Sequence, residues 1–176
     1  LLFLFAFSAL LSGQEVSQSG LRFEGARPMI AQPERAPKAM IASVHELATE
    51  AGIAMLKKGG NAVDAAVAIA FALAVVHPEA WNLGGSGYMM VRLADGKTTV
   101  FDYGVNVPLK ASPEMFQNTA PRNIGYPSIG VPGTPAGMGM AHAKYGKLKW
   151  AEVLEPARKL AHHGFPASQR MEIILK

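Results

Sequence analysis

"GGNAVDAAVAIAFALAVVHP" (59–78) is the stretch of sequence that decides the fold. Asn61 is a favourable N-cap residue, and Asp64, three positions later, places a carboxylate near the free N–H groups of a first helical turn. The next twelve residues (65–76) are all apolar, which is too few to span a bilayer and leaves the helix no polar face. We therefore predict a core helix that other elements cover on all sides and that ends at Pro78.

The segment before this helix predicts a second helix. Ser43 and Glu46 have the spacing of a capping box, with Ser43 as the N-cap. "HELATEAGIAMLKK" (45–58) then carries apolar residues at helical spacing and two lysines at its end, where the helix dipole favours positive charge. The pair Gly59-Gly60 is expected to stop this helix.

The segment after the core helix predicts a β-hairpin over 86–103, with strands on either side of the turn "ADG" (94–96). The glycines that precede it, in "GGSG" (84–87), could be a phosphate-binding loop or a place where backbone passes close to backbone. A phosphate loop runs from a strand into a helix N-terminus, whereas these glycines run from a helix into a strand. We therefore favour close packing at the point where the strands enter a sheet.

Two more helices are expected towards the end of the chain. "GVPGTPAGMGMAHAKYG" (130–146) is a proline-glycine turn that leads into a small-residue helix, in which Gly137 and Ala141 are compatible with a tight contact to another helix. The segment 149–165 has the pattern of an amphipathic helix. Pro156 lies inside it, so we expect a kink or a new helix start there.

Composition and isolated residues exclude several function classes. The chain is 49% apolar and 17% charged, with a net charge of +4 and no basic stripe, so nucleic-acid binding is not expected. It has no cysteine, which excludes disulfides and thiolate chemistry. Asp102 ends a strand, where a carboxylate is catalytic or structural, and Ser86 lacks the preceding strand of a nucleophile elbow. No metal site is expected from the five histidines, which lack a metal-binding spacing: His45, His77, His142, His162 and His163.

The two ends of the sequence bear on location and completeness. Residues 1–11 are apolar except for Ser8, and small residues follow, so 1–13 has the pattern of a partial signal peptide rather than of a membrane span. A buried first helix is the alternative. A polar segment (14–35) follows, and we expect export to the periplasm or the cell exterior. The chain stops in the apolar run "MEIILK" (171–176), so we expect a fragment of a longer protein.

Two long stretches resemble the N-terminal part of the γ-glutamyltranspeptidase family. They are "EAGIAMLKKGGNAVDAAVAIAFALAVVHPEAWNLGGSGYMMV" (50–91) and "VPGTPAGMGMAHAKYGKLKWAEVLEPARKLAHHGF" (131–165). The likeness extends over 36–176, and "GGNAVDAAVA" is specific to the family. It implies an α+β fold, the αββα sandwich of the N-terminal-nucleophile (Ntn) hydrolases, of which this chain would supply outer helices and the first hairpin of the central sheets.

The resemblance also implies an activity. Members are made as precursors that cleave themselves, and the new N-terminal Thr of the small subunit attacks γ-glutamyl amides such as glutathione to form an acyl-enzyme. That Thr would lie after residue 176, so the rest of its own chain is the expected partner and this segment alone is expected to be inactive. A small-molecule amide is the expected substrate, and no cofactor or metal is implied.

One departure from the family pattern concerns substrate recognition. The family has an Arg-Glu pair after the second strand, and its Arg binds the α-carboxylate of the γ-glutamyl group. Gly104 and Val105 stand at these two candidate substrate-binding positions, so the arginine contact to the α-carboxylate is not retained. Asn106 or Arg122 could bind the carboxylate instead. The flanking pattern is kept at Asp102, Tyr103 and Pro108.

Three functions remain open at this point. The first is an exported γ-glutamyltransferase or hydrolase. The second is an Ntn-type acylase of the same architecture that takes a non-glutamyl acyl group. The third is a non-catalytic exported binding protein that kept the fold.

Overall fold

The computed structural model describes residues 35–116, 125 and 128–175. The predicted signal peptide, all but the last residue of the polar segment 14–35, and Arg122 lie outside these residues. The chain divides into two units, 1–38 and 39–176, and every described element belongs to the second. In chain order these elements are α1 (Glu46–Lys57), α2 (Ala62–Val76), β1 (Tyr88–Arg92), β2 (Thr98–Asp102), the short 3₁₀ helix η1 (Pro113–Phe116), α3 (Thr134–Tyr145), α4 (Trp150–His163) and α5 (Gln169–Leu175).

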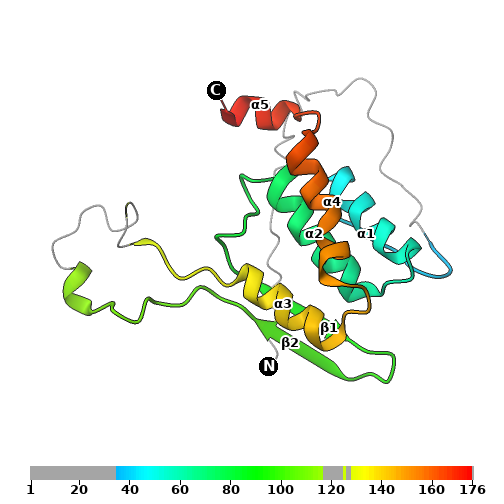
Figure 1. Cartoon of the computed structure of the whole chain (residues 1–176). Helices are drawn as coiled ribbons and strands as arrows, with labels where there is room; N and C mark the ends of the chain where they lie inside the picture. The colour runs from blue at the N-terminus through cyan, green and yellow to red at the C-terminus, as the bar shows by residue number, and fades with distance from the viewer. Residues whose placement is uncertain (1–34, 117–124, 126–127, 176) are drawn as a thin grey trace, which may run out of the picture. The chain divides into compact units, whose positions relative to one another are not determined.

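Helix α2 is the centre of the core, as its sequence predicts. Ten of its fifteen residues are buried, and it packs against α1, α3 and α4 (Figure 1). Asn61 is its N-cap, and the Asn61 side chain accepts hydrogen bonds from the N–H groups of Val63 and Asp64 at 2.9 and 3.1 Å. The Asp64 carboxylate in turn accepts from Asn61 N–H at 2.8 Å, which completes a capping box.

The predicted capping box of α1 is wrong. The helix begins at Glu46 with His45 as its N-cap, and His45 Nδ1 accepts from Leu47 N–H at 3.2 Å. Because the helix starts later than Ser43 would place it, the Ser43 hydroxyl lies beside the first turn, 2.7 Å from the hydroxyl of Thr49. The His45 imidazole therefore caps α1, where the sequence pattern predicts that the Ser43 hydroxyl would do so.

Helix α4 runs without interruption from Trp150 to His163, so the expected new helix start at Pro156 is wrong. Proline has no N–H, which leaves the carbonyl of Glu152 without its helical donor. Glu152 is exposed, so water can satisfy that carbonyl and the helix tolerates the proline.

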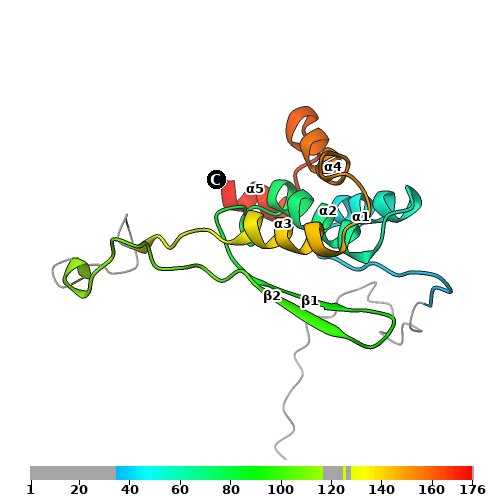
Figure 2. The same cartoon turned by 60° about the horizontal axis from the view of Figure 1, so that its bottom comes forward.

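The hairpin forms as predicted, with antiparallel pairing from Tyr88↔Asp102 to Arg92↔Thr98. Gly96 has φ +86° in the turn, a conformation that favours glycine. Side chains alternate along both strands, and Met89 and Phe101 face the core. Figure 2 shows the helices as a layer over one face of this two-stranded sheet, with α3 directly above it.

The glycines before β1 allow close packing, which confirms the reading of this stretch. The carbonyl of Gly85 accepts from the N–H groups of Gly133 and Thr134 at 3.0 and 3.2 Å, so it satisfies the donors at the start of α3. Gly87 forms backbone hydrogen bonds with Tyr103, and a Cβ at Gly87 would lie 3.0 Å from the Tyr103 ring.

Tyr103 joins the hairpin to α3. Its side chain is 6% exposed, and burial raises the pKa of its hydroxyl. A Cβ on Gly137 of α3 would collide with the ring of Tyr103. Gly137 therefore makes a tight contact, but its partner is the ring of Tyr103 after β2 and not the helix that the sequence predicts.

Asp64 is a fully buried carboxylate that holds the start of α2 to the α3–α4 connection. Besides Asn61, it accepts from Lys147 N–H at 3.0 Å and from Leu148 N–H at 3.2 Å. His142 Nε2 lies 3.3 Å from the same carboxylate, at an angle outside hydrogen-bond geometry. A buried charge is tolerated only when it is hydrogen-bonded in this way.

We predict that Asp64→Asn destabilises the protein by about 3 kcal/mol, because the amide presents a donor to N–H groups that need an acceptor. Chemical unfolding measures this difference. Asp95→Asn is the matched control, since Asp95 is an exposed turn residue paired with Lys97, and this variant should unfold at nearly the same denaturant midpoint as the wild type. Equal midpoints for the two variants would contradict the role given to Asp64.

Two glycines of α3 give a second prediction. Gly137→Ala should destabilise by roughly 1–3 kcal/mol, because the new methyl group collides with Tyr103. Gly139→Ala should stabilise by about 0.5–1 kcal/mol, because nothing lies within 4 Å of the added Cβ and alanine is the better helix former. Thermal unfolding of both variants should therefore give shifts of opposite sign, and shifts of the same sign would refute the contact.

Candidate functional site

The end of β2 positions a short segment with several polar groups. Tyr103 is anchored in the core, so the residues after it leave the sheet at a fixed point. Asp102 Oδ1 accepts from Gly104 N–H at 2.9 Å, and Asn106 exchanges two backbone hydrogen bonds with Val131, at 3.3 and 2.8 Å. The segment is therefore held at both ends.

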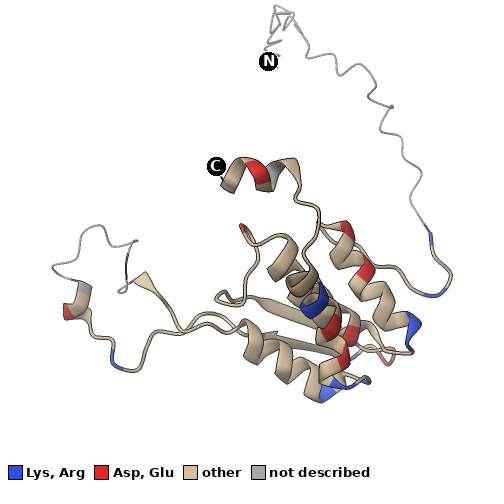
Figure 3. Cartoon of the chain, turned by 45° about the horizontal axis from the view of Figure 1, so that its top comes forward, with Lys and Arg blue, Asp and Glu red and all other residues tan. Residues whose placement is uncertain are grey.

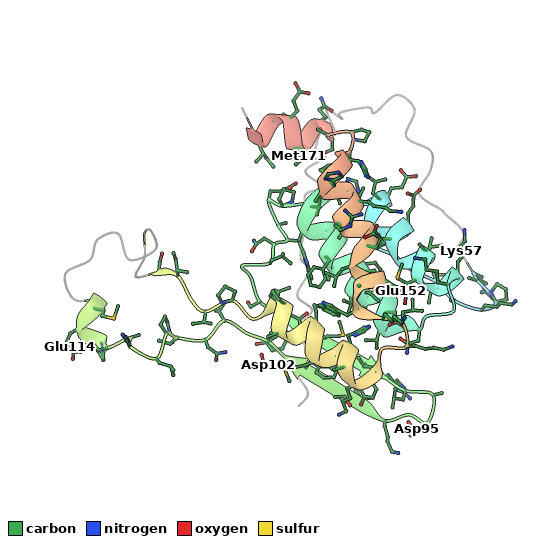
Figure 4. All side chains as sticks on the ribbon, viewed as in Figure 1. Lys57, Asp95, Asp102, Glu114, Glu152 and Met171 are labelled. Carbon is green, nitrogen blue, oxygen red and sulfur yellow. The ribbon has the colours of Figure 1, made fainter. Side chains whose placement is uncertain are left out.

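A cavity of about 330 Å³ lies against this segment. It contains both positions at which the sequence predicts substrate contacts, Gly104 and Val105, together with the alternative Asn106. Asp102 also lines it, and Figure 4 labels this residue at the end of the hairpin that meets α3. The structure therefore brings these separately considered residues together at one place.

Tyr88 completes the cavity and was missed by the sequence reasoning. The signal was present, because a turn centred on Asp95 puts Tyr88 directly opposite Asp102. Directly opposite residues in an antiparallel pair point to the same side of the sheet. The phenol therefore lines the same cavity as the carboxylate.

Among the described residues that line this cavity, Asp102 is the one that carries a charge. Within the described residues no Lys, Arg or His nitrogen lies within 4.0 Å of its carboxylate. Over the rest of the described chain, Lys and Arg positions are spread across several helices and loops (Figure 3).

The histidines serve local structure. His45 caps α1, His77 pairs with Glu79 at 3.1 Å, and His142 contacts the buried Asp64. The rings of His162 and His163 lie 4.8 Å apart, edge to face. Among the described residues no group of three or more His, Cys, Asp or Glu side chains could hold a metal ion. No serine or threonine hydroxyl among them, Ser86 included, is hydrogen-bonded to a histidine ring; of His45, the Ser43 hydroxyl contacts only backbone atoms.

A larger groove of about 480 Å³ lies between α2 and α4, away from these residues. Its lining is apolar except for Glu155 and Arg158, which form a salt bridge with each other at 2.6 Å. Size alone does not make a site, and this groove offers no free acid, base or nucleophile. In the described part of the chain, no helix is both long and apolar enough to cross a bilayer.

Comparisons with known proteins agree with the fold and with the sequence motifs. The chain is 41% identical over 182 residues to the glutathione hydrolase proenzyme of Escherichia coli K12, covering 97% of this chain and 31% of that protein. The crystal structure of Helicobacter pylori γ-glutamyltranspeptidase matches with a TM-score of 0.76 and 45% identity, covering 81% of this chain and 43% of that one.

A more distant structure is the cephalosporin acylase from Bacillus halodurans. It matches with a TM-score of 0.68 and 28% identity, covering 79% of this chain and 28% of that one.

The chain spans about a third of the length of the E. coli glutathione hydrolase proenzyme. Residues 48–176 match the family model described as Gamma-glutamyltranspeptidase, and with these likenesses the α+β chain belongs to the γ-glutamyltranspeptidase family.

Proposed function

We propose that the full-length protein hydrolyses or transfers γ-glutamyl amides such as glutathione. The observation that carries this proposal is the 41% identity, across 97% of the chain, to a protein named a glutathione hydrolase proenzyme. The higher identity to a γ-glutamyltranspeptidase than to a cephalosporin acylase, 45% against 28%, favours γ-glutamyl chemistry over a non-glutamyl acylase.

The proposed mechanism needs residues beyond this segment. The resemblance implies that an N-terminal Thr, released by self-cleavage, attacks the amide carbonyl while its own amino group takes the proton. The amine leaves, and water or an acceptor amine then releases the acyl group. Residues 1–176 would contribute the scaffold and one wall of the acyl pocket, at Asp102 and positions 104–106.

The experiment is a donor assay. Full-length protein should hydrolyse L-γ-glutamyl-p-nitroanilide and separate into two subunits on a denaturing gel. The isolated 176-residue chain should release no p-nitroaniline above a boiled sample. The resemblance implies that the nucleophilic Thr lies outside it, and no serine or threonine hydroxyl among its described residues is hydrogen-bonded to a histidine ring. Turnover by the isolated chain would contradict the proposal that the nucleophile lies outside residues 1–176. An inactive full-length protein would contradict the proposed function itself.

We also propose that the protein is exported, on the basis of the apolar run at 1–11 and the small residues after it. Expressed with its complete N-terminus, the protein should lose the segment that ends near Ser12–Gln14. Intact-mass measurement of secreted or periplasmic material checks this. A mature protein that retains the apolar run would rule out a cleaved signal peptide.

A further inference from the structure

We propose that the apolar groove between α2 and α4 is a docking surface for a helix from the part of the same polypeptide that follows residue 176. The docked helix inserts large apolar side chains into the groove and completes the cover of α2. This inference concerns packing alone, so it does not depend on the proposed γ-glutamyl chemistry.

Helix α2 is apolar all round but is not covered all round. Residues 65–76 carry no polar side chain, a pattern typical of a helix that other elements enclose on every side. Ala74 and Val75 are nevertheless only partly buried, and both line the groove. Phe71 lines it too, three and four positions earlier on the same face of the helix. One strip of the core helix therefore lacks its cover within the described residues.

Helix α4 forms the other wall of the groove. It packs against α2 (Figure 1), with Val153 and Ala157 as its buried residues. Beside them a second apolar stripe lines the groove, made of Ala151, Leu154 and Ala161, which share one face of the helix. The two alanines of this stripe are exposed. The helix thus carries a wider apolar surface than its contact with α2 uses.

The lining fits an apolar helix better than a small polar ligand. Four of the lining residues are alanines, whose short side chains let another backbone approach closely while larger side chains of the occupant fill the space. The charged lining residues, Glu155 and Arg158, are paired with each other at 2.6 Å, so this lining offers no unpaired charge to orient a polar ligand. An amphipathic helix with large apolar residues on one face meets both conditions.

The same polypeptide can supply such a helix. This chain covers 31% of the E. coli glutathione hydrolase proenzyme, so about two thirds of that relative has no counterpart in residues 1–176. The resemblance places this chain at the N-terminal part of the family, so the additional length follows residue 176. A helix tethered in this way reaches the groove at an effective concentration that a second copy of the protein or a free apolar ligand lacks.

Thiol labelling of the full-length protein tests whether the groove is covered. Residues 1–176 contain no cysteine, and any cysteine in the rest of the protein is first replaced by serine. Ala161→Cys places a thiol in the groove, and Ala143→Cys is the matched control at an exposed position of α3 that does not line it. A maleimide should modify position 161 at least about tenfold more slowly in native than in unfolded protein, because the docked helix covers the thiol. The control thiol should react at similar rates in both states.

A photo-crosslinker at the rim of the groove identifies what covers it. p-Benzoylphenylalanine in place of the exposed Arg158 should join to a peptide from after residue 176, in a product with the mass of one protomer. A product of twice that mass would show a second copy in the groove and overturn the inference. A crosslink to residues 1–34, or a thiol at position 161 that reacts equally fast in native and unfolded protein, would also overturn it. Neither readout needs catalysis, so an inactive full-length protein would refute the proposed function and leave this inference standing.

Discussion

The burial of the Asp64 charge is the constraint on which the described structure depends. A carboxylate can leave water only if hydrogen-bond donors replace its hydration shell, and here the donors are backbone N–H groups of Asn61, Lys147 and Leu148. Because these groups belong to the start of α2 and to the connection between α3 and α4, satisfying one charge fixes three helices relative to one another. Apolar packing along α2 stabilises the core but does not select one orientation of the neighbouring helices, because it is non-directional. The hydrogen bonds to the Asp64 carboxylate are directional and select that orientation.

The position of the cavity at the end of β2 depends on how these helices are fixed. Helix α3 is placed by its connection to α4, and Tyr103 is placed by the glycines of α3 and of the segment before β1. Asp102 and Gly104 flank Tyr103, so a buried ring with little freedom determines where two exposed positions lie. Because Asp102 and Gly104 adjoin a buried residue, their positions are more rigid than those of residues in a loop without such an anchor.

The sequence predicts the elements well and their junctions less well. The core helix, its Asn61–Asp64 cap and the hairpin follow from strong local patterns, and all are present. His45 replaces Ser43 as the cap of α1, and Pro156 is tolerated inside α4, because cap choice and proline tolerance depend on neighbours and on solvent exposure. At the candidate site, the family resemblance alone predicts Gly104 and Val105. Placing Tyr88 in the cavity requires the strand register, and placing Asn106 there requires its pairing with Val131.

The long separation of the Asp64 contacts along the chain has a consequence for biosynthesis. Asp64 and Lys147 are 83 positions apart, and Asn61 and the Tyr145 carbonyl that it contacts are 84 apart. A nascent chain is made from its N-terminus, so α1 and α2 are complete long before the donors for the carboxylate exist. Until residue 148 has left the ribosome, the start of α2 must stay hydrated and the apolar run behind it lacks its cover from α3 and α4. During this interval the apolar residues 65–76 are exposed to water, which is the condition under which growing chains aggregate.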